Sequence, residues 1–347
     1  MPDLQARFLG EHESAVWPEP LCSAGGFVSL DSWSSFLCKI YGFEIFRIEV
    51  SVKGKPAGFI VLCHVKHSLF GDYLSTAPFA SYGGFAYDSP DARDTLLAEA
   101  RSLVQKLGAD YAVVRFDDGS MPPTAGWIQQ PVYSTYLLDL PEDPDMLFAG
   151  FGSDHRNHVR KSLKKGFKIR FGHLDLLDEA YEGLARSMHE LGSPYHSKTY
   201  LRAMAESLKD NLEFAVVHDS KGRLAGAGVF IFHHGVATNL HANILRRFRQ
   251  DYTGEFLYWS VISRYSLLGF RMFDMGRSLI GSGNETFKMK WKPRKKALAY
   301  WYAMRSGGDL PDLNQKNPKF RFAIWTWKRL PAFVVRPLGP SLIRGLA

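Results

Sequence analysis

Hydrophobic and polar residues follow the same order of patterns in the two halves of the chain. In the first half they predict two strands around a short turn, one helix and two further strands, at 44–50, 56–65, 91–107, 111–116 and 132–138. In the second half they predict the same order, at 212–218, 224–233, 255–268, 271–275 and 297–304. Corresponding elements lie about 166 residues apart, which is the near-constant offset that a duplicated α+β unit leaves.

Further elements are predicted between the two repeats. The pattern indicates three helices and one alternating strand, at 154–165, 176–191, 199–208 and 167–171. An acidic turn at 141–144 separates the halves. We therefore expect a first domain at 1–141, a second domain at 142–305 and a C-terminal tail at 306–347.

Charge is divided unevenly between the halves. The chain has 347 residues and a formal net charge of +8. Residues 1–152 carry a net charge of −9, whereas residues 153–347 carry +17. A strongly basic half indicates an anionic partner for that half.

Several classes of protein do not fit this sequence. Three cysteines without a CxxC spacing argue against a disulfide framework and a thiolate zinc site. No apolar run of roughly 18 residues occurs and no apolar segment lies near the N-terminus, so we expect a cytoplasmic protein without a membrane-spanning helix. Two histidine pairs, His155 with His158 and His233 with His234, lack an HExxH motif and a carboxylate-rich companion, so we expect no metal site.

A basic block covers residues 156–170, with seven Lys or Arg residues in fifteen and no acidic residue. Arg156, Arg160 and Lys164 recur every fourth residue, which places them on one face of the predicted helix. The block is either a binding surface for phosphate or nucleic acid, or a solvated helix face. The sequence leaves both interpretations open.

A second block follows the predicted strand at 271–275. Asp274, Arg277 and Ser278 lie where that strand ends, and ligands bind at such strand ends in α/β layers. Lys288 follows on a short helix, where it is available as a cation for a phosphate or a carboxylate. The alternative is a turn held by an ion pair between Asp274 and Arg277.

The last 33 residues contain seven basic residues and no acidic one, interleaved with phenylalanine and tryptophan. This composition is typical of a segment that lies on an anionic membrane. Pro331, Pro337 and Pro340 are expected to break any long helix there. Packing of the tail over the second domain is the alternative.

Taken in order, these motifs resemble the FemAB-like transferases, which are tandem-GNAT proteins related to the peptidoglycan-bridge aminoacyltransferases. Residues 73–84 look like the first-domain S-x-P-F-x-x-Y-G-G stretch, and residues 156–166 are similar to the R-x-x-[VI]-R-K-x-x-K-x-G helix. Residues 274–291 resemble the D-F-G-R-S…F-K-x-x-W ending. The tail at 327–340 resembles a branch associated with exopolysaccharide and exosortase (PEP-CTERM) gene sets.

The resemblance implies an α+β fold of two tandem GNAT-like domains, each a mixed sheet flanked by helices. It implies transfer of an acyl or aminoacyl group to an amine or hydroxyl, with Lys288 stabilising charge near the reacting carbonyl or holding the donor's phosphate. Asp274 is the best candidate among the carboxylates for a catalytic role. The residues expected to bind substrate or donor are Arg277, Ser278, Phe287, Arg156, Arg160, Tyr82 and Trp291. No metal and no permanently bound cofactor are expected.

The donor stays open between acyl-CoA, an acyl carrier and aminoacyl-tRNA. The nearest match to the R-x-x-G-x-[GA] loop of acetyl-CoA enzymes is residues 249–254, where the spacing differs. The helical arm of some bridge-forming members has no counterpart, because no long heptad segment occurs. Nucleic acid is an expected partner only if the donor is aminoacyl-tRNA. The expected acceptor is a small-molecule or lipid-linked sugar, reached at the inner face of the cytoplasmic membrane if the tail docks there.

A rival hypothesis is a binding module without catalysis. The basic half and its aromatic tail would then dock RNA or an anionic membrane. A steep salt dependence without turnover would favour this alternative. Loss of transfer in a folded Lys288→Ala variant would favour the transferase.

Overall fold

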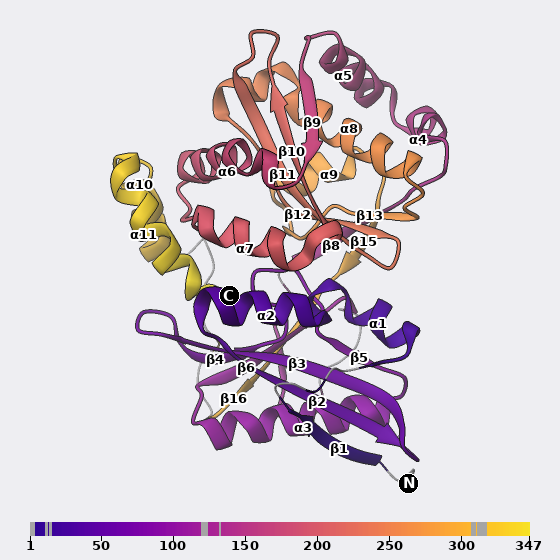
Figure 1. The fold of residues 1–347 in the computed structure, drawn as a ribbon, viewed down its shortest axis with the longest axis vertical. Helices are drawn as coiled ribbons and strands as arrows, with labels where there is room; N and C mark the ends of the chain where they lie inside the picture. Colours follow the sequence, from indigo (N-terminus) through magenta and orange to yellow (C-terminus); the bar gives the residue numbers. More distant parts are fainter. Residues whose placement is uncertain are drawn as a thin grey trace. The chain divides into compact units, whose positions relative to one another are not determined.

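The computed structural model describes residues 4–10, 13, 16–118, 124–131, 133–306, 310 and 318–347, without the side chains of residues 318–321. Over these residues the chain forms two compact units (Figure 1). The first comprises Met1–Thr135, Lys296–Pro311 and Arg344–Ala347, and the second comprises Tyr136–Lys295 and Asp312–Ile343. Each unit is described below by itself.

The first unit contains a mixed sheet with the strand order β1-β2-β3-β4-β6-β16-β7, and β5 pairs with β3. Its strands are β1 (Leu4–Leu9), β2 (Glu44–Val52), β3 (Lys55–His67), β4 (Gly71–Ser75), β5 (Phe85–Tyr87), β6 (Tyr111–Phe116), β7 (Ile128–Gln129) and β16 (Ala299–Met304). Its helices are α1 (Glu19–Gly25), α2 (Asp31–Tyr41) and α3 (Pro90–Leu107).

The second unit contains a mixed sheet with the strand order β14-β8-β13-β12-β11-β10-β9, and β15 pairs with β8. Its strands are β8 (Tyr133–Asp139), β9 (Lys168–Gly172), β10 (Leu212–His218), β11 (Leu224–His233), β12 (Val236–Ile244), β13 (Met272–Asp274), β14 (Ser278–Leu279) and β15 (Arg294–Ala297). Its helices are α4 (Pro144–Gly150), α5 (Ser153–Leu163), α6 (Leu177–Leu191), α7 (Lys198–Leu208), α8 (Thr253–Leu267), α9 (Gly283–Met289), α10 (Pro318–Trp327) and α11 (Ala332–Arg344).

Local sequence signals explain the helix boundaries. Ser89 caps α3, because its hydroxyl accepts a hydrogen bond from the Ala92 amide, and Pro90 occupies the first turn. Gly108 ends the same helix in the left-handed conformation, with φ of 68°. The apolar stripe of α3 is buried in the first core. The α+β class with two mixed, helix-flanked sheets is confirmed.

The last strands of the two repeats lie in each other's sheets, which differs from the sequence prediction. The strand expected to end the first domain is β8, and it pairs with β13 in the second sheet, where Leu138 lies opposite Phe273. The strand expected to end the second domain is β16, and it pairs with β6 in the first sheet, where Trp301 lies opposite Val114. Hydrophobic alternation predicts that a strand exists but not which strand it joins. The expected ranges 1–141 and 142–305 therefore differ from the compact units.

The tail forms two helices in the second unit, within the part of it that the structure describes. Pro331 lies between α10 and α11, as expected, but α11 continues through Pro337 and Pro340. Gly339 packs against the backbone of Tyr195, where a Cβ atom would lie 2.9 Å from the carbonyl oxygen. The helix thus continues despite the local cost of proline, and it packs closely on Tyr195 next to Pro340.

Candidate functional site

Strands β12 and β13 run parallel, pair briefly and then part. Thr238 lies opposite Asp274, where β13 ends, whereas β12 continues to Ile244. In its pairing with β11, β12 has a bulge at Leu240, between the residues that face Val229 and Phe230. A bulge leaves backbone groups outside the ladder. Among the described strands, none pairs with this edge of β12 beyond Thr238.

A cavity of about 440 Å³ opens beside the end of β12. Its walls come from the end of α6, from β12, from the segment leading into α8, and from α8 and α9. Its lining residues are Leu191, Ala242, Asn243, Ile244, Arg249, Gly254, Glu255, Tyr258, Asn284 and Phe287. The volume is in the range of small-molecule sites, and polar and aromatic side chains both contribute to the lining.

The start of α8 is suited to an anion. Tyr252 precedes this 15-residue helix in the left-handed conformation, with φ of 57°, and provides no side-chain cap. The amide groups of the first turn and the positive end of the helix dipole therefore favour a phosphate or carboxylate. Arg249 adds a cation next to it and is anchored by a hydrogen bond from Nε to the Ile244 carbonyl, at 3.2 Å. Residues 249–254, the imperfect match to an acetyl-CoA loop, thus lie at the cavity.

A tight turn connects β13 to α9. Gly276 has φ of 74°, and a Cβ atom there would lie 2.8 Å from the Asn239 carbonyl oxygen, so only glycine fits. The Asp274 carboxylate accepts a hydrogen bond from the Gly276 amide at 2.8 Å. The Lys288 ammonium donates to the carbonyl oxygens of Gly276 and Arg277, at 2.7 and 3.0 Å. These bonds fix the turn on which Arg277 and Ser278 stand.

Lys288 is buried, with only 4% of its surface exposed. Burial lowers the pKa of its ammonium to about 8, although the Asp274 carboxylate acts in the opposite direction. The ammonium contacts the two backbone carbonyls and the face of the Tyr136 ring, whose centroid is 5.3 Å away. This geometry is that of a group that positions the turn.

The structure separates the other residues of the 274–291 block into two sets. Phe287 lines the cavity and packs edge-to-face against Tyr258, with ring centroids 5.1 Å apart. Asp274, Ser278 and Trp291 are buried, and Arg277 is partly buried. The block is therefore brought together around one turn, but Phe287 alone of its predicted site residues lines the cavity.

Arg156 and Arg160 lie beside α4. The Arg156 guanidinium donates to the carbonyl oxygens of Ala149 and Phe151, at 2.9 and 2.5 Å, and so caps the end of that helix. Arg160 lies over the Phe148 ring, 5.2 Å from its centroid. Tyr82 belongs to the first unit, where it is partly buried.

Sequence reasoning missed several residues of the cavity. Tyr258, Asn284 and the end of β12 were not predicted as site residues, and Arg249 was noted only as part of an imperfect motif. The basic block does approach the start of α8, but through Lys161, which lies 5.8 Å from the Tyr252 ring, and Lys165, which pairs with Asp251 at 2.8 Å. The imperfect loop motif was the one available signal.

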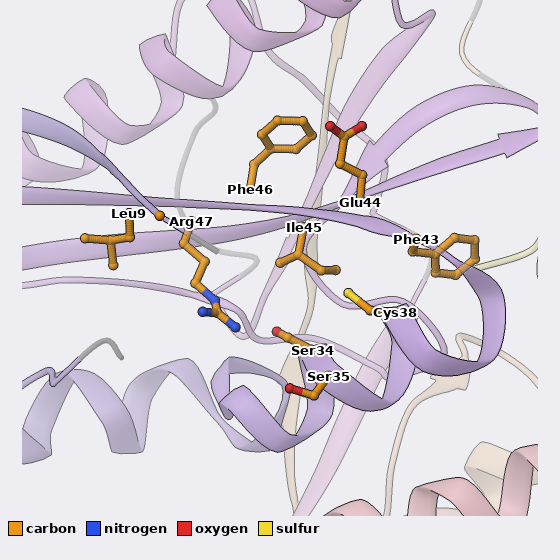
Figure 2. A pocket seen from close by; sticks show the side chains of 10 residues that line it. Leu9, Ser34, Ser35, Cys38, Phe43, Glu44, Ile45, Phe46 and Arg47 are labelled. Carbon is orange, nitrogen blue, oxygen red and sulfur yellow. The ribbon is translucent and has the colours of Figure 1, made fainter. Parts of the chain in front are cut away.

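The first unit has a cavity of its own, of about 520 Å³, between the start of β2 and α2. Figure 2 shows Ile45 and Arg47 extending toward Ser34 and Cys38, whereas Glu44 and Phe46 point to the other face of the strand. Arg47 pairs with Asp31 at 3.1 Å. No residue predicted as a site residue lines this cavity.

Comparisons with known proteins agree with this architecture. Residues 153–289 match the family model of the acetyltransferase (GNAT) domain. The crystal structure of FemX has a TM-score of 0.64 and 14% identity, covering 87% of this chain and 98% of that one. A tandem GNAT protein from the clavulanic acid biosynthesis pathway has a TM-score of 0.55 and 12% identity, covering 88% and 100%.

A third similar structure is the Saccharomyces cerevisiae N-myristoyltransferase with bound myristoyl-CoA, with a TM-score of 0.52 and 12% identity, covering 92% of this chain and 86% of that one. At 12–14% sequence identity, the similarity to these structures shows only that the fold is shared. A search of curated protein sequences returned no match. The chain therefore has a tandem GNAT fold and contains a GNAT acetyltransferase domain at residues 153–289.

Proposed function

We propose that this protein is a FemAB-like acyltransferase that transfers an acyl or aminoacyl group to an amine or hydroxyl of a cell-envelope or exopolysaccharide precursor. The observation that carries the proposal is the cavity between the free edge of β12 and the start of α8, inside the GNAT domain. The envelope acceptor rests on the sequence resemblance to the FemAB-like family.

The cavity favours a donor that combines phosphate with an extended amide arm. The phosphate would bind at the α8 N-terminus and Arg249. The amide arm would form hydrogen bonds with the free edge of β12, as an added strand does. Acyl-CoA and a phosphopantetheine acyl carrier both have this chemistry, and we favour them over aminoacyl-tRNA.

Transfer requires the nucleophile to attack the donor's carbonyl carbon while the thiol leaves. The bulge at Leu240 leaves backbone groups outside the β11–β12 ladder, and an amide N–H of this stretch would stabilise the developing oxyanion. Holding donor and acceptor together supplies much of the remaining acceleration. Asp274 and Lys288 act by positioning, because their charged groups bind the backbone of the turn at Gly276.

Replacement of Arg249 by alanine tests the donor site. We expect the variant to bind acetyl-CoA roughly 10- to 100-fold more weakly, because a hydrogen bond to a charged group contributes about 1.5–3 kcal/mol. The measurement is isothermal titration with acetyl-CoA. Arg247→Ala is the matched control, because Arg247 stacks on Phe248, 4.6 Å from the ring centroid, and does not line the cavity. Equal affinity in both variants would contradict this donor site.

Native mass spectrometry of freshly purified protein separates the transferase from the binding module. A retained CoA, carrier-linked or nucleotide-sugar ligand would support the transferase. Binding to RNA with a steep salt dependence, together with no turnover in a donor screen, would favour the rival hypothesis.

We also propose that the tail places the enzyme at an anionic membrane. No helix among the described residues is long and apolar enough to cross a membrane. The tail helices expose four large apolar side chains, Phe322, Trp325, Phe333 and Leu338. Arg329 stacks on Trp325, 3.9 Å from its ring centroid, and aromatic residues next to cations suit the bilayer interface. Val335 and Gly339 of α11 are buried, and Arg336 pairs with Glu182 of α6 at 2.6 Å.

Vesicle flotation tests this surface. We expect the full chain to float with phosphatidylglycerol vesicles, and a Phe322→Ser, Phe333→Ser double variant to remain at the bottom of the gradient. Leu267→Ser is the matched control, because Leu267 is equally exposed, at 71%, but lies at the end of α8. A parent protein that does not float would refute membrane docking.

A further inference from the structure

Two histidines and a carboxylate converge between α5 and α8. His155 and His158 lie three positions apart on α5, which places them on one helix face. Glu255 lies in the first turn of α8, and one potential ligand atom from each residue lies within 4.8 Å of the others. We infer that these three side chains form a binding site for a divalent transition metal such as Zn²⁺.

The hydrogen bonding of the cluster supports this inference. His155 is only 5% exposed, and neither of its ring nitrogens has a hydrogen-bond partner among the described residues. The buried Nδ1 of His158 likewise lacks a partner within the described part of the chain. Buried polar groups without partners are rare and costly in folded proteins. One metal ion would satisfy ring nitrogens of both histidines and the Glu255 carboxylate together.

The donor set matches zinc chemistry. Two imidazoles and one carboxylate are a common set of protein ligands for Zn²⁺, with the fourth position left to water or substrate. Metal–ligand bonds of about 2.1 Å require donor atoms about 3.4 Å apart, so donor atoms now within 4.8 Å of one another must close by up to about 1.4 Å. Rotation of the imidazole rings and of the flexible Glu255 side chain supplies such a movement.

The Lys290 ammonium would compete with a metal ion for the Glu255 carboxylate. Its ammonium lies 3.9 Å from the Glu255 carboxylate and balances part of that buried charge. A bound cation would repel it. Replacing Lys290 with methionine is therefore expected to strengthen metal binding, which a non-specific surface site would not show.

The test is titration of the apoprotein with Co²⁺, which gives visible absorption bands in a tetrahedral site, followed by displacement with Zn²⁺. We expect about one equivalent to bind, and Glu255→Gln and His158→Ala to weaken binding at least about tenfold. His234→Ala is the control, because His234 is exposed in a second histidine pair. Circular dichroism and thermal melting establish that each variant is folded.

Zn²⁺ is also expected to raise the melting temperature of the parent but not of the folded Glu255→Gln variant. The inference is overturned if the parent binds no Co²⁺ with tetrahedral bands, or if Glu255→Gln binds as tightly as the parent. Acyl transfer is not measured in this experiment, so its outcome is independent of the proposed function.

Discussion

Replacing Trp291 with alanine is expected to lower the free energy of unfolding by about 3–5 kcal/mol, the range for removing a large aromatic side chain from a core. The indole is fully buried. It packs edge-to-face against His155 and Phe151, with ring centroids 4.3 and 5.5 Å apart, and lies beside Tyr258 at 6.0 Å. Urea unfolding of parent and variant, followed by circular dichroism, measures the change.

Trp325→Ala provides the comparison for Trp291. Its indole is 53% exposed, and we expect its removal to change the free energy of unfolding by less than about 0.5 kcal/mol. A Trp291 variant that is as stable as the parent would show that this residue is not part of the core. The resemblance implied that Trp291 binds the donor. Because Trp291 is buried, we expect it instead to pack behind Phe287, which lines the cavity.

Replacing Lys288 with methionine is expected to lower kcat by roughly 100-fold while the KM for the donor changes little. Methionine preserves most of the volume but leaves the carbonyl oxygens of Gly276 and Arg277 without their charged donor. A displacement of the turn by about 1 Å is enough for a loss of this size. Steady-state kinetics separate the two parameters, and Lys164→Met is the control, because Lys164 is exposed on the basic block. A parent-like kcat would refute the role given to Lys288.

The parent protein and the Lys288→Met variant are also expected to differ in how their free energy of unfolding depends on pH. Because the pKa of Lys288 is about 8 in the folded protein and near its usual higher value in the unfolded chain, the unfolded chain binds more protons between these values. The free energy of unfolding of the parent should therefore rise with pH above about 8, relative to that of Lys288→Met. Transfer that depends on the ammonium should fall as the pH rises through about 8.

The sequence predicts those parts of the fold that depend on neighbouring residues. The hairpin of β10 and β11, the helix α3 and the helix α8 lie within a few residues of their predicted positions. Each has a strong local pattern, with glycine or serine at its boundary. The partners of β8 and β16 could not be predicted, since strand pairing depends on residues far along the chain.

The site was predicted less completely than the fold. The block from Asp274 to Trp291 was identified, but its side chains are mostly buried, which spacing alone does not show. Strand β12 was missed because polar residues such as Asn239 and Asn243 interrupt the apolar alternation, and the bulge at Leu240 shifts its period. The open edge of β12 has a separate cause, because its parallel neighbour β13 ends at Asp274, opposite Thr238.

The exchange of final strands has a consequence for synthesis on the ribosome. The central strand β6 ends at Phe116, but its neighbour β16 is complete only at Met304. At about 5–20 residues per second, the β6 edge waits roughly 10–40 s for its partner. During that interval Ala112 and Val114, which are buried in the finished core, lack Ala303 and Trp301, their partners in the sheet. The nascent chain therefore has an unpaired β6 edge, which can pair with other chains, until residues 299–304 have been synthesised.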